Sequence, residues 1–185
     1  MGIILASKSP RRQELLSLMG LEFQVITADI DETIDKRLPI EREISRLSRQ
    51  KAEAILDNDN IIISADTVVV LGNTVMGKPR DAENARQMLN LLSGKTHRVI
   101  TAVTVKKGDK ILTEAVSTEI VFRQLSNREI DAYVASGSPM DKAGAYGVQE
   151  KAATFVKEIH GDYFSVVGLP VCTLAVMLRE FGIEI

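Results

Sequence analysis

A run of β-branched, apolar residues near the middle of the chain most constrains its fold. Residues 61–63 are Ile-Ile-Ile, and residues 68–71 are Val-Val-Val-Leu. Apolar runs without the alternation of a half-exposed strand are typical of a strand that is covered on both faces. Helices on both sides of a sheet give that cover, so the run predicts a central strand of an α/β sheet. Residues 64–67, Ser-Ala-Asp-Thr, interrupt the run, and we expect a break in the strand there.

Helical and strand-like segments alternate along the chain, with a hairpin between two strands. We expect helices over residues 11–19, 39–56, 82–92, 126–135 and after 170, and further strands over residues 21–27, 99–106, 111–122 and 154–159. The hairpin signal at residues 107–110, Lys-Gly-Asp-Lys, favours a mixed central sheet over a purely parallel one. We find no repeat or Gly/Ser-rich linker, so the 185 residues are expected to form one domain, 1–185.

Composition excludes several classes of protein. The formal net charge is −2, so no general positive field is present to hold nucleic acid. No apolar run is long enough to span a bilayer and no signal peptide is recognisable, so we expect no membrane association and a cytoplasmic location. The one cysteine, Cys172, rules out an internal disulfide and a multi-cysteine metal site. It lies in an apolar helical stretch and is expected to be a buried core thiol.

The N-terminus predicts a site for an anion. A short apolar strand, Ile3-Ile4-Leu5, leads into a hydroxylated loop that contains Ser7, and Pro10 stands where a helix can begin. The first turn of that helix would direct its backbone N–H groups, together with Arg11 and Arg12, toward the strand end. Ligands of open α/β sheets bind at the carboxyl ends of strands, and phosphate is the anion that best suits this geometry. The alternative is an ordinary capped surface helix with two solvated arginines.

Asp66 is the most informative single residue. It lies between two fully apolar runs, where a carboxylate is costly unless it is paired, bound to a metal or open to a ligand. We therefore consider it a candidate to coordinate a divalent ion or to accept a proton from water. The alternative is an Asp that closes a turn or caps a neighbouring helix.

Two further segments have unusual composition. Lys78 lies between Gly77 and Pro79, where it could present one charge to a phosphate, although a plain turn explains the tripeptide equally well. Residues 140–149 combine two glycines with small residues around Asp141 and Lys142, and they end at Gln149, whose amide both donates and accepts hydrogen bonds. A planar ligand could lie over this segment; the alternative is a connecting loop. By spacing alone, Lys51 and Glu32 look like solvated surface residues.

Taken together, several motifs resemble those of the Maf family, in that family's order and spacing, over nearly the whole chain. They are Ser7-Lys8-Ser9-Pro10-Arg11-Arg12, Ala65-Asp66-Thr67, Gly77-Lys78-Pro79, Ser93-Gly94-Lys95-Thr96-His97 with Ile100-Thr101-Ala102-Val103, Met140 to Gln149, and Gly168-Leu169-Pro170. The resemblance implies a nucleoside triphosphate pyrophosphatase, which cleaves the α–β phosphoanhydride to a monophosphate and pyrophosphate. It also implies a mixed sheet flanked by helices, as in the inosine triphosphatases, with two closely joined lobes and an active-site cleft between them.

Three positions separate the branches of that family. This chain has Arg11, Thr67 and Gln149 at these positions, which resembles the branch that acts on dTTP and UTP. The branch that acts on 7-methyl-GTP typically has a bulky aromatic residue, Gln and Glu there. The resemblance therefore implies that these three residues recognise a pyrimidine base, with modified pyrimidine nucleotides as further substrates.

The resemblance also implies a role for several charged residues. Glu32 and Asp66, with Asp141, would hold a divalent cation such as Mg²⁺, Mn²⁺ or Co²⁺, and Asp66 would be the proton acceptor for the attacking water. Lys51 and Lys78 would act with Asp66 in catalysis. Substrate phosphates would contact a further set of residues, namely Ser7, Arg12 and Lys142. A homodimer is common in the family.

Two rival functions stay open at this level. The first is a pyrophosphatase that removes purine triphosphates such as ITP and XTP, on a similar fold. The second is a non-catalytic nucleotide-binding regulator of cell division. A binding module does not need a lone carboxylate such as Asp66 among basic groups, which favours an enzyme.

Overall fold

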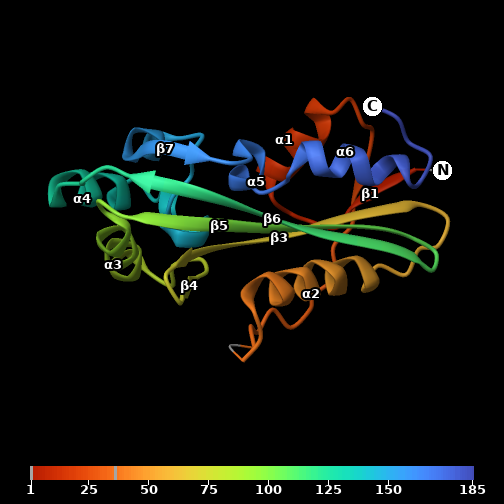
Figure 1. Cartoon of the computed structure of the whole chain (residues 1–185), viewed down its shortest axis with the longest axis horizontal. Coiled ribbons are helices and arrows are strands. Elements are labelled where there is room, and N and C mark those ends of the chain that lie inside the picture. Colours follow the sequence, from red (N-terminus) through yellow and green to blue (C-terminus); the bar gives the residue numbers. More distant parts are fainter. Residues whose placement is uncertain (1, 36) are drawn as a thin grey trace. The chain divides into compact units, whose positions relative to one another are not determined.

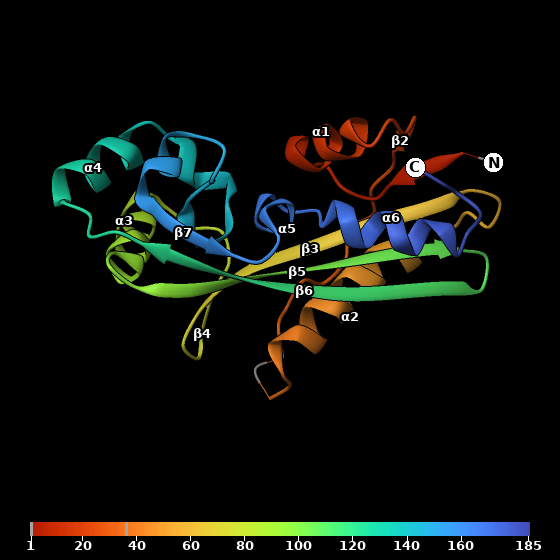
Figure 2. The same cartoon turned by 45° about the horizontal axis from the view of Figure 1, so that its top comes forward.

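The structure is a computed structural model that describes residues 2–35 and 37–185 (Figures 1 and 2). Its elements follow one another in the order β1 (Ile3–Leu5), α1 (Pro10–Leu18), β2 (Gln24–Val25), α2 (Ile40–Glu53), β3 (Ile61–Leu71), β4 (Thr74–Met76), α3 (Ala82–Leu92), β5 (Thr96–Lys107), β6 (Lys110–Phe122), α4 (Asn127–Ala135), β7 (Val156–His160), α5 (Tyr163–Val167) and α6 (Val171–Arg179). Three 3₁₀ turns, η1 (Ser138–Asp141), η2 (Ala143–Ala145) and η3 (Lys151–Phe155), lie between α4 and β7. None of the described helices is long and apolar enough to cross a membrane.

The chain divides into two compact units, which we describe separately. Unit 1 consists of Met1–Asp66, Thr101–Val116 and Gly168–Ile185, and unit 2 of Thr67–Ile100 and Ser117–Val167. Strands β3, β5 and β6 each contribute residues to both units. A single Maf-like domain over residues 1–185 stays a prediction, because compactness alone does not show which segments fold independently.

The predicted mixed sheet is confirmed. Within the described residues, seven strands form one sheet in the order β2-β1-β3-β5-β6-β7, and β4 pairs with β3. Strand β1 runs parallel to β2 and β3, whereas β4 is antiparallel to β3 and β7 is antiparallel to β6. The parallel pairs need crossover connections, which α1 and α2 provide.

Strand β3 is continuous, so the predicted break at residues 64–67 is wrong. The polar side chains of Ser64 and Asp66, on which that expectation rested, both have hydrogen-bond partners. The Ser64 hydroxyl donates a hydrogen bond to the carbonyl of Ser48 at 2.6 Å, and Ala65 is fully buried. The Asp66 carboxylate accepts a hydrogen bond from Lys51. The strand therefore continues to Leu71 at no cost from unpaired polar groups.

In unit 1, helices cover both faces of the sheet. Helix α2 lies on one face, and α1 and α6 lie on the other (Figures 1 and 2). Leu16 of α1 and Ile44 and Leu47 of α2 are buried to at least 99%, as are Leu5 and Ile62 of the sheet. Each such side chain contributes about 1.5–3 kcal/mol of transfer free energy. This packing fixes the strand ends from which the candidate site is built.

The starts of the predicted helices are mostly confirmed. Pro10 begins α1, although the Ser9 side chain in front of it makes no capping hydrogen bond. Asp81 caps α3 by accepting a hydrogen bond from the Asn84 N–H at 2.7 Å. Ser126 and Glu129 form the reciprocal capping box that their spacing indicates. Hydroxyl and carboxylate side chains at these positions satisfy N–H groups that the helix itself cannot.

Cys172 corrects one expectation. It is exposed, not buried. The buried residues of α6 are Leu174, Met177 and Leu178, so Cys172 lies two residues away from the inward stripe, on the outer face of the helix. An apolar composition around a cysteine therefore did not reveal which side of the helix faces the core.

The core of unit 2 contains an aromatic cluster around one buried histidine. His97 is 2% exposed and makes edge contacts with Phe122 and Tyr146, at centroid distances of 4.9 and 5.4 Å. The His97 Nε2 and the Tyr146 hydroxyl are hydrogen-bonded at 2.7 Å, whereas Nδ1 is buried without a partner among the described residues. Burial lowers the pKa of His97 to about 4, because removal from water disfavours the charged ring.

We predict that His97 makes unfolding pH-dependent. Its pKa is lower in the folded chain than the ordinary value of 6.5, so the folded state favours the neutral ring. The resulting stability is complete above pH 6.5 and is lost as the pH falls toward 4. Linkage gives a loss of about 2 kcal/mol between pH 7 and pH 5. Urea unfolding at the two pH values measures it, and His97→Gln should remove most of this difference.

His160→Gln is the matched control, because His160 is exposed and pairs with Glu158 on β7. We expect it to leave the pH dependence of unfolding almost unchanged. Equal pH dependence in the unaltered chain and in His97→Gln would contradict the prediction.

Candidate functional site

The predicted anion site at the start of α1 is organised around Arg12. The Arg12 Nε donates to the carbonyl of Gly168 at 2.8 Å, and its Nη1 donates to the Ser7 hydroxyl at 3.1 Å. Ser7 is buried and also accepts a hydrogen bond from the Ser9 N–H at 3.3 Å. The N-terminal motif and the Gly168-Leu169-Pro170 motif, far apart in the sequence, are thus joined within unit 1.

Lys51, Asp66 and Glu32 form the charged centre of unit 1. The Lys51 ammonium contacts Asp66 Oδ1 at 2.5 Å and Glu32 Oε1 at 2.8 Å. The side chains of Lys51 and Asp66 are each only 14% exposed, whereas that of Glu32 is 64% exposed. Lys51 is therefore not the solvated residue that helical spacing suggested. Its charge compensates a carboxylate that the buried strand β3 could not otherwise accommodate.

The electrostatics of Arg12 place it in the same charged group. Removal from water lowers the pKa of its guanidinium, and Arg11 lowers that pKa further. The carboxylates of Asp66 and Glu32 act in the opposite direction and raise it. Arginine stays protonated under these conditions, so Arg12 is a cation held near two carboxylates. Unit 1 therefore combines Ser7, Arg12 and the Lys51 centre in one region.

Two serines that the sequence analysis missed hold the Lys51–Asp66 pair in register. The Ser64 hydroxyl bonds to the Ser48 carbonyl, and the Ser48 hydroxyl lies 2.9 Å from that of Thr104. Ser48 precedes Lys51 by three residues on α2, and Ser64 precedes Asp66 by two on β3, so each serine lies on the same side of its element as the charged residue that follows it. The sequence signal was the position of each serine within an otherwise apolar stripe. The structure shows that both serines are fully buried.

Glu32 and Asp66 are the described residues of unit 1 best suited to a divalent metal. No group of three or more His, Cys, Asp or Glu side chains gathers in residues 2–35 and 37–185 to form a metal cage. Two carboxylates do converge on one point, the Lys51 ammonium. Mg²⁺ is typically bound by one or two carboxylates together with substrate phosphates and water, so this donor set fits such an ion.

In unit 2, two predicted motifs lie side by side. The Gly144 N–H donates to the carbonyl of Gly77 at 3.0 Å, which joins the turn of Lys78 to the glycine-rich segment. Gly144 has a φ of +66°, and a Cβ there would lie 2.7 Å from Cγ2 of Val69. Only glycine tolerates both the positive φ and the close approach of Val69. Lys78 itself is exposed, as a lysine that meets a mobile anion needs to be.

Lys142 is more enclosed than its predicted role suggested. Its ammonium contacts Asp141 Oδ1 at 2.7 Å and also Glu150 Oε1 at 2.9 Å. Gln149 is exposed on the turn that follows, and Thr67 is partly buried on β3. Glu150 was not identified from sequence, because nothing in its spacing from Lys142 indicates a contact. The roles of all these residues in binding a substrate stay predictions.

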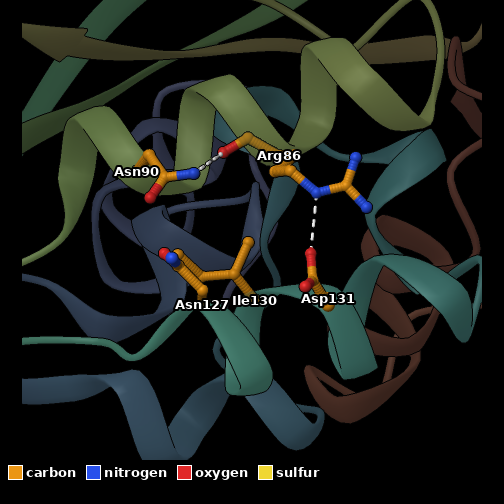
Figure 3. Close-up of a pocket in the computed structure, with 5 residues that line it drawn as sticks. All are labelled: Arg86, Asn90, Asn127, Ile130 and Asp131. Carbon is orange, nitrogen blue, oxygen red and sulfur yellow. Dashed lines mark hydrogen bonds and ion pairs between the residues drawn. The ribbon is translucent and has the colours of Figure 1, made fainter.

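A pocket of about 220 Å³ lies between α3 and α4, and it contains none of the predicted residues (Figure 3). It is lined by Arg86, Asn90, Asn127, Ile130 and Asp131. Arg86 Nε donates to Asp131 at 2.7 Å and Nη1 donates to Glu83 at 2.7 Å. Because two carboxylates already compensate its one cation, the pocket is poorly suited to an anionic ligand.

The serine contact leads to a prediction for stability. Ser64→Ala removes the hydrogen bond to the Ser48 carbonyl in a fully buried setting, so we expect a loss of about 1–3 kcal/mol in the free energy of unfolding. Ser48→Ala leaves the acceptor in place, because the acceptor is a backbone carbonyl, so Ser64→Ala should cost about as much in the Ser48→Ala background. Urea unfolding of the four chains measures both quantities.

Ser45→Ala is the matched control. The Ser45 hydroxyl bonds to the Glu41 carbonyl within α2 itself and therefore makes no contact with β3. We expect Ser45→Ala and Ser64→Ala to be additive. A loss below about 0.5 kcal/mol for Ser64→Ala would show that its hydroxyl does not join the strand to the helix.

Comparison with known proteins agrees with the motifs. The family described as Maf-like protein matches residues 2–181. Proteins named dTTP/UTP pyrophosphatase from Bacillus cereus (strain AH820), from Bacillus anthracis and from Bacillus thuringiensis subsp. konkukian (strain 97-27) are 47% identical over 185 residues, covering 99% of this chain and 97% of each relative. The Ham1 protein of Staphylococcus aureus has a TM-score of 0.48 at 16% identity, covering 97% of this chain and 99% of that one. The chain belongs to the Maf family.

Proposed function

We propose that this protein hydrolyses dTTP and UTP between the α and β phosphates, releasing the nucleoside monophosphate and pyrophosphate. Relatives that are 47% identical over nearly the whole chain carry the name dTTP/UTP pyrophosphatase. Arg11, Thr67 and Gln149 agree with the branch of the family that this name describes. The cytoplasm and a homodimer stay predictions.

One observation carries the chemical part of the proposal. Asp66 Oδ1 is held by Lys51, whereas Oδ2 has no protein hydrogen-bond partner within the described residues. A carboxylate fixed through one oxygen presents the other in a defined direction. Oδ2 can therefore accept a proton from a water molecule while Lys51 prevents rotation of the side chain.

The cations of unit 1 would bind the substrate phosphates. Ser7 and the Gly168 carbonyl fix the Arg12 guanidinium before the substrate arrives. Arginine suits phosphate because its planar fork of donors matches two oxygens at once. Helix α1 begins at Pro10, beside this residue, and its N-terminus also favours an anion. Lys78 is the further cation that the family resemblance assigns to catalysis.

The chemical step transfers one proton and breaks one bond. The water oxygen bonds to the α phosphorus as Asp66 Oδ2 takes its proton, and the bond from that phosphorus to the bridging oxygen breaks with its electron pair leaving on pyrophosphate. Glu32 and Asp66, with Asp141 by resemblance, would hold the divalent ion. When bound, that ion supplies positive charge for the phosphates and lowers the pKa of water. Lys51 and Arg12 stabilise the negative charge that develops.

The recognition of the base is assigned to Gln149, with Arg11 and Thr67. An amide both donates and accepts, as the imide edge of uracil and thymine requires. A base with a different pattern would leave these groups unpaired, which is the strongest form of discrimination between similar substrates.

We predict that Asp66→Asn lowers kcat for UTP by at least about a hundredfold, because the amide cannot accept the proton of water. Pyrophosphate release in the presence of Mg²⁺ or Mn²⁺ measures the rate, and thermal unfolding checks that the chain folds. Asp59→Asn is the control, since Asp59 is an exposed carboxylate in the turn before β3. Normal turnover by Asp66→Asn would remove this residue from the reaction.

We also predict that Gln149→Glu lowers kcat/KM for UTP by about tenfold or more, because a carboxylate loses the donor that the base needs. Kinetics on UTP and 7-methyl-GTP measure the change in preference. Gln87→Glu on the exposed face of α3 introduces the same charge in unit 2 and serves as the control. An equal effect of both substitutions on the two nucleotides would contradict the assignment.

The decisive experiment for the function is pyrophosphate release from a panel of nucleotides. Turnover of UTP and dTTP above that of other nucleotides supports the proposal. Faster turnover of ITP would favour a purine-directed enzyme, and binding without turnover would favour a regulator.

A further inference from the structure

We propose that Lys142 is a positioning residue that holds the turn bearing Gln149, and that it does not bind the substrate phosphates. This inference rests on the proposed function in one respect, namely that Gln149 recognises the base. Its structural part concerns residues of unit 2 alone.

All three donors of the Lys142 ammonium are already in use. They contact the Ser138 carbonyl at 2.7 Å, Asp141 Oδ1 at 2.7 Å and Glu150 Oε1 at 2.9 Å. An ammonium group has three N–H bonds and no more. A phosphate oxygen could therefore bind only by displacing one of these partners.

Burial and charge also disfavour a phosphate at Lys142. Its side chain is 6% exposed, whereas those of Asp141 and Glu150 are 58% and 39% exposed. The group that an approaching anion meets first is therefore negative. One cation against two carboxylates leaves a net negative charge, which repels phosphate. Phosphate-binding lysines act instead as accessible point charges.

Lys142 contacts both ends of one turn. The Glu150 N–H donates to the Gly147 carbonyl at 3.2 Å, which closes a four-residue turn with Gln149 at its third position. At the last residue of the turn, the Glu150 carboxylate binds the Lys142 ammonium. At the first, Gly147 packs against the lysine stem so closely that a Cβ would lie 2.6 Å from Cε and 2.8 Å from Cδ.

Other contacts hold the part of the segment that precedes this turn, whereas Lys142 contacts the turn itself. Upstream, the Gly144 N–H binds the Gly77 carbonyl, and the Tyr146 hydroxyl binds His97. Gln149 itself is exposed. Its direction therefore depends on the two turn ends, and both of these contact Lys142.

The test compares Lys142→Met and Glu150→Gln with two controls. Lys142→Met keeps a long stem and removes the charge, whereas Glu150→Gln leaves the lysine in place and weakens its bond to the turn. Lys151→Met removes an exposed lysine nearby, and Glu83→Gln weakens the ion pair with Arg86 in the same unit. Amide hydrogen exchange over residues 146–150 and the ratio of kcat/KM for UTP to that for CTP are measured for each chain.

We expect both test variants to speed exchange in residues 146–150 by about tenfold or more, as local opening becomes easier. The preference for UTP over CTP should fall by about tenfold, since Gln149 is misdirected. The two controls should change neither quantity. If Lys142→Met does not fold, Gly147→Ala replaces it, because the added methyl displaces the lysine stem.

Two results would overturn the inference. One is unchanged exchange in both test variants. The other is an equal rise of KM for UTP and CTP in Lys142→Met that Glu150→Gln does not reproduce, as expected for a phosphate ligand. Faster exchange in a protein that hydrolyses neither nucleotide would instead refute the proposed function and support the role of Lys142 in holding the turn.

Discussion

The contact between the Lys51 ammonium and the Asp66 carboxylate is the interaction on which unit 1 depends. A carboxylate in the middle of a buried strand is tolerated only if a cation compensates it, and that cation must come from a neighbouring element. Helix α2 brings the cation, and the Ser48–Ser64 contact fixes where along β3 the helix lies. Glu32, from a loop, adds a second carboxylate to the same ammonium. Helix and loop thus pack around the residue that is most costly to place in the strand.

The parts of this arrangement that could be predicted are those that break a local pattern. Asp66 interrupts an apolar run, so its importance follows from the sequence alone. Lys51 breaks no pattern: helical spacing places it on a polar face, and only the fold shows that a strand and a loop enclose that part of the face. The break expected at residues 64–67 was wrong for the same reason, since the partners that satisfy Ser64 and Asp66 lie 16 and 15 residues earlier in the chain.

In unit 2, the sequence indicates that the glycines allow close packing, but not which groups pack against them. The sequence shows that Gly144 and Gly147 make the segment unusual, and their positions indicate close approach of a backbone to something else. It does not show that the neighbours are protein side chains, namely Val69 and the stem of Lys142, and not a ligand. A glycine-rich segment can therefore serve dense packing beneath an exposed residue such as Gln149. Glu150 could not be recognised from spacing, because a turn and not a helix brings it to Lys142.

The charges of unit 1 explain why the proposed reaction needs further cations. Arg11, Arg12 and Lys51 are positive and Glu32 and Asp66 are negative, so one net positive charge remains. A nucleoside triphosphate carries about four negative charges, and cleavage concentrates more of them on the departing pyrophosphate. One net positive charge offsets only part of that charge, however well the groups are oriented. The family resemblance assigns the additional charge to a divalent ion and to Lys78.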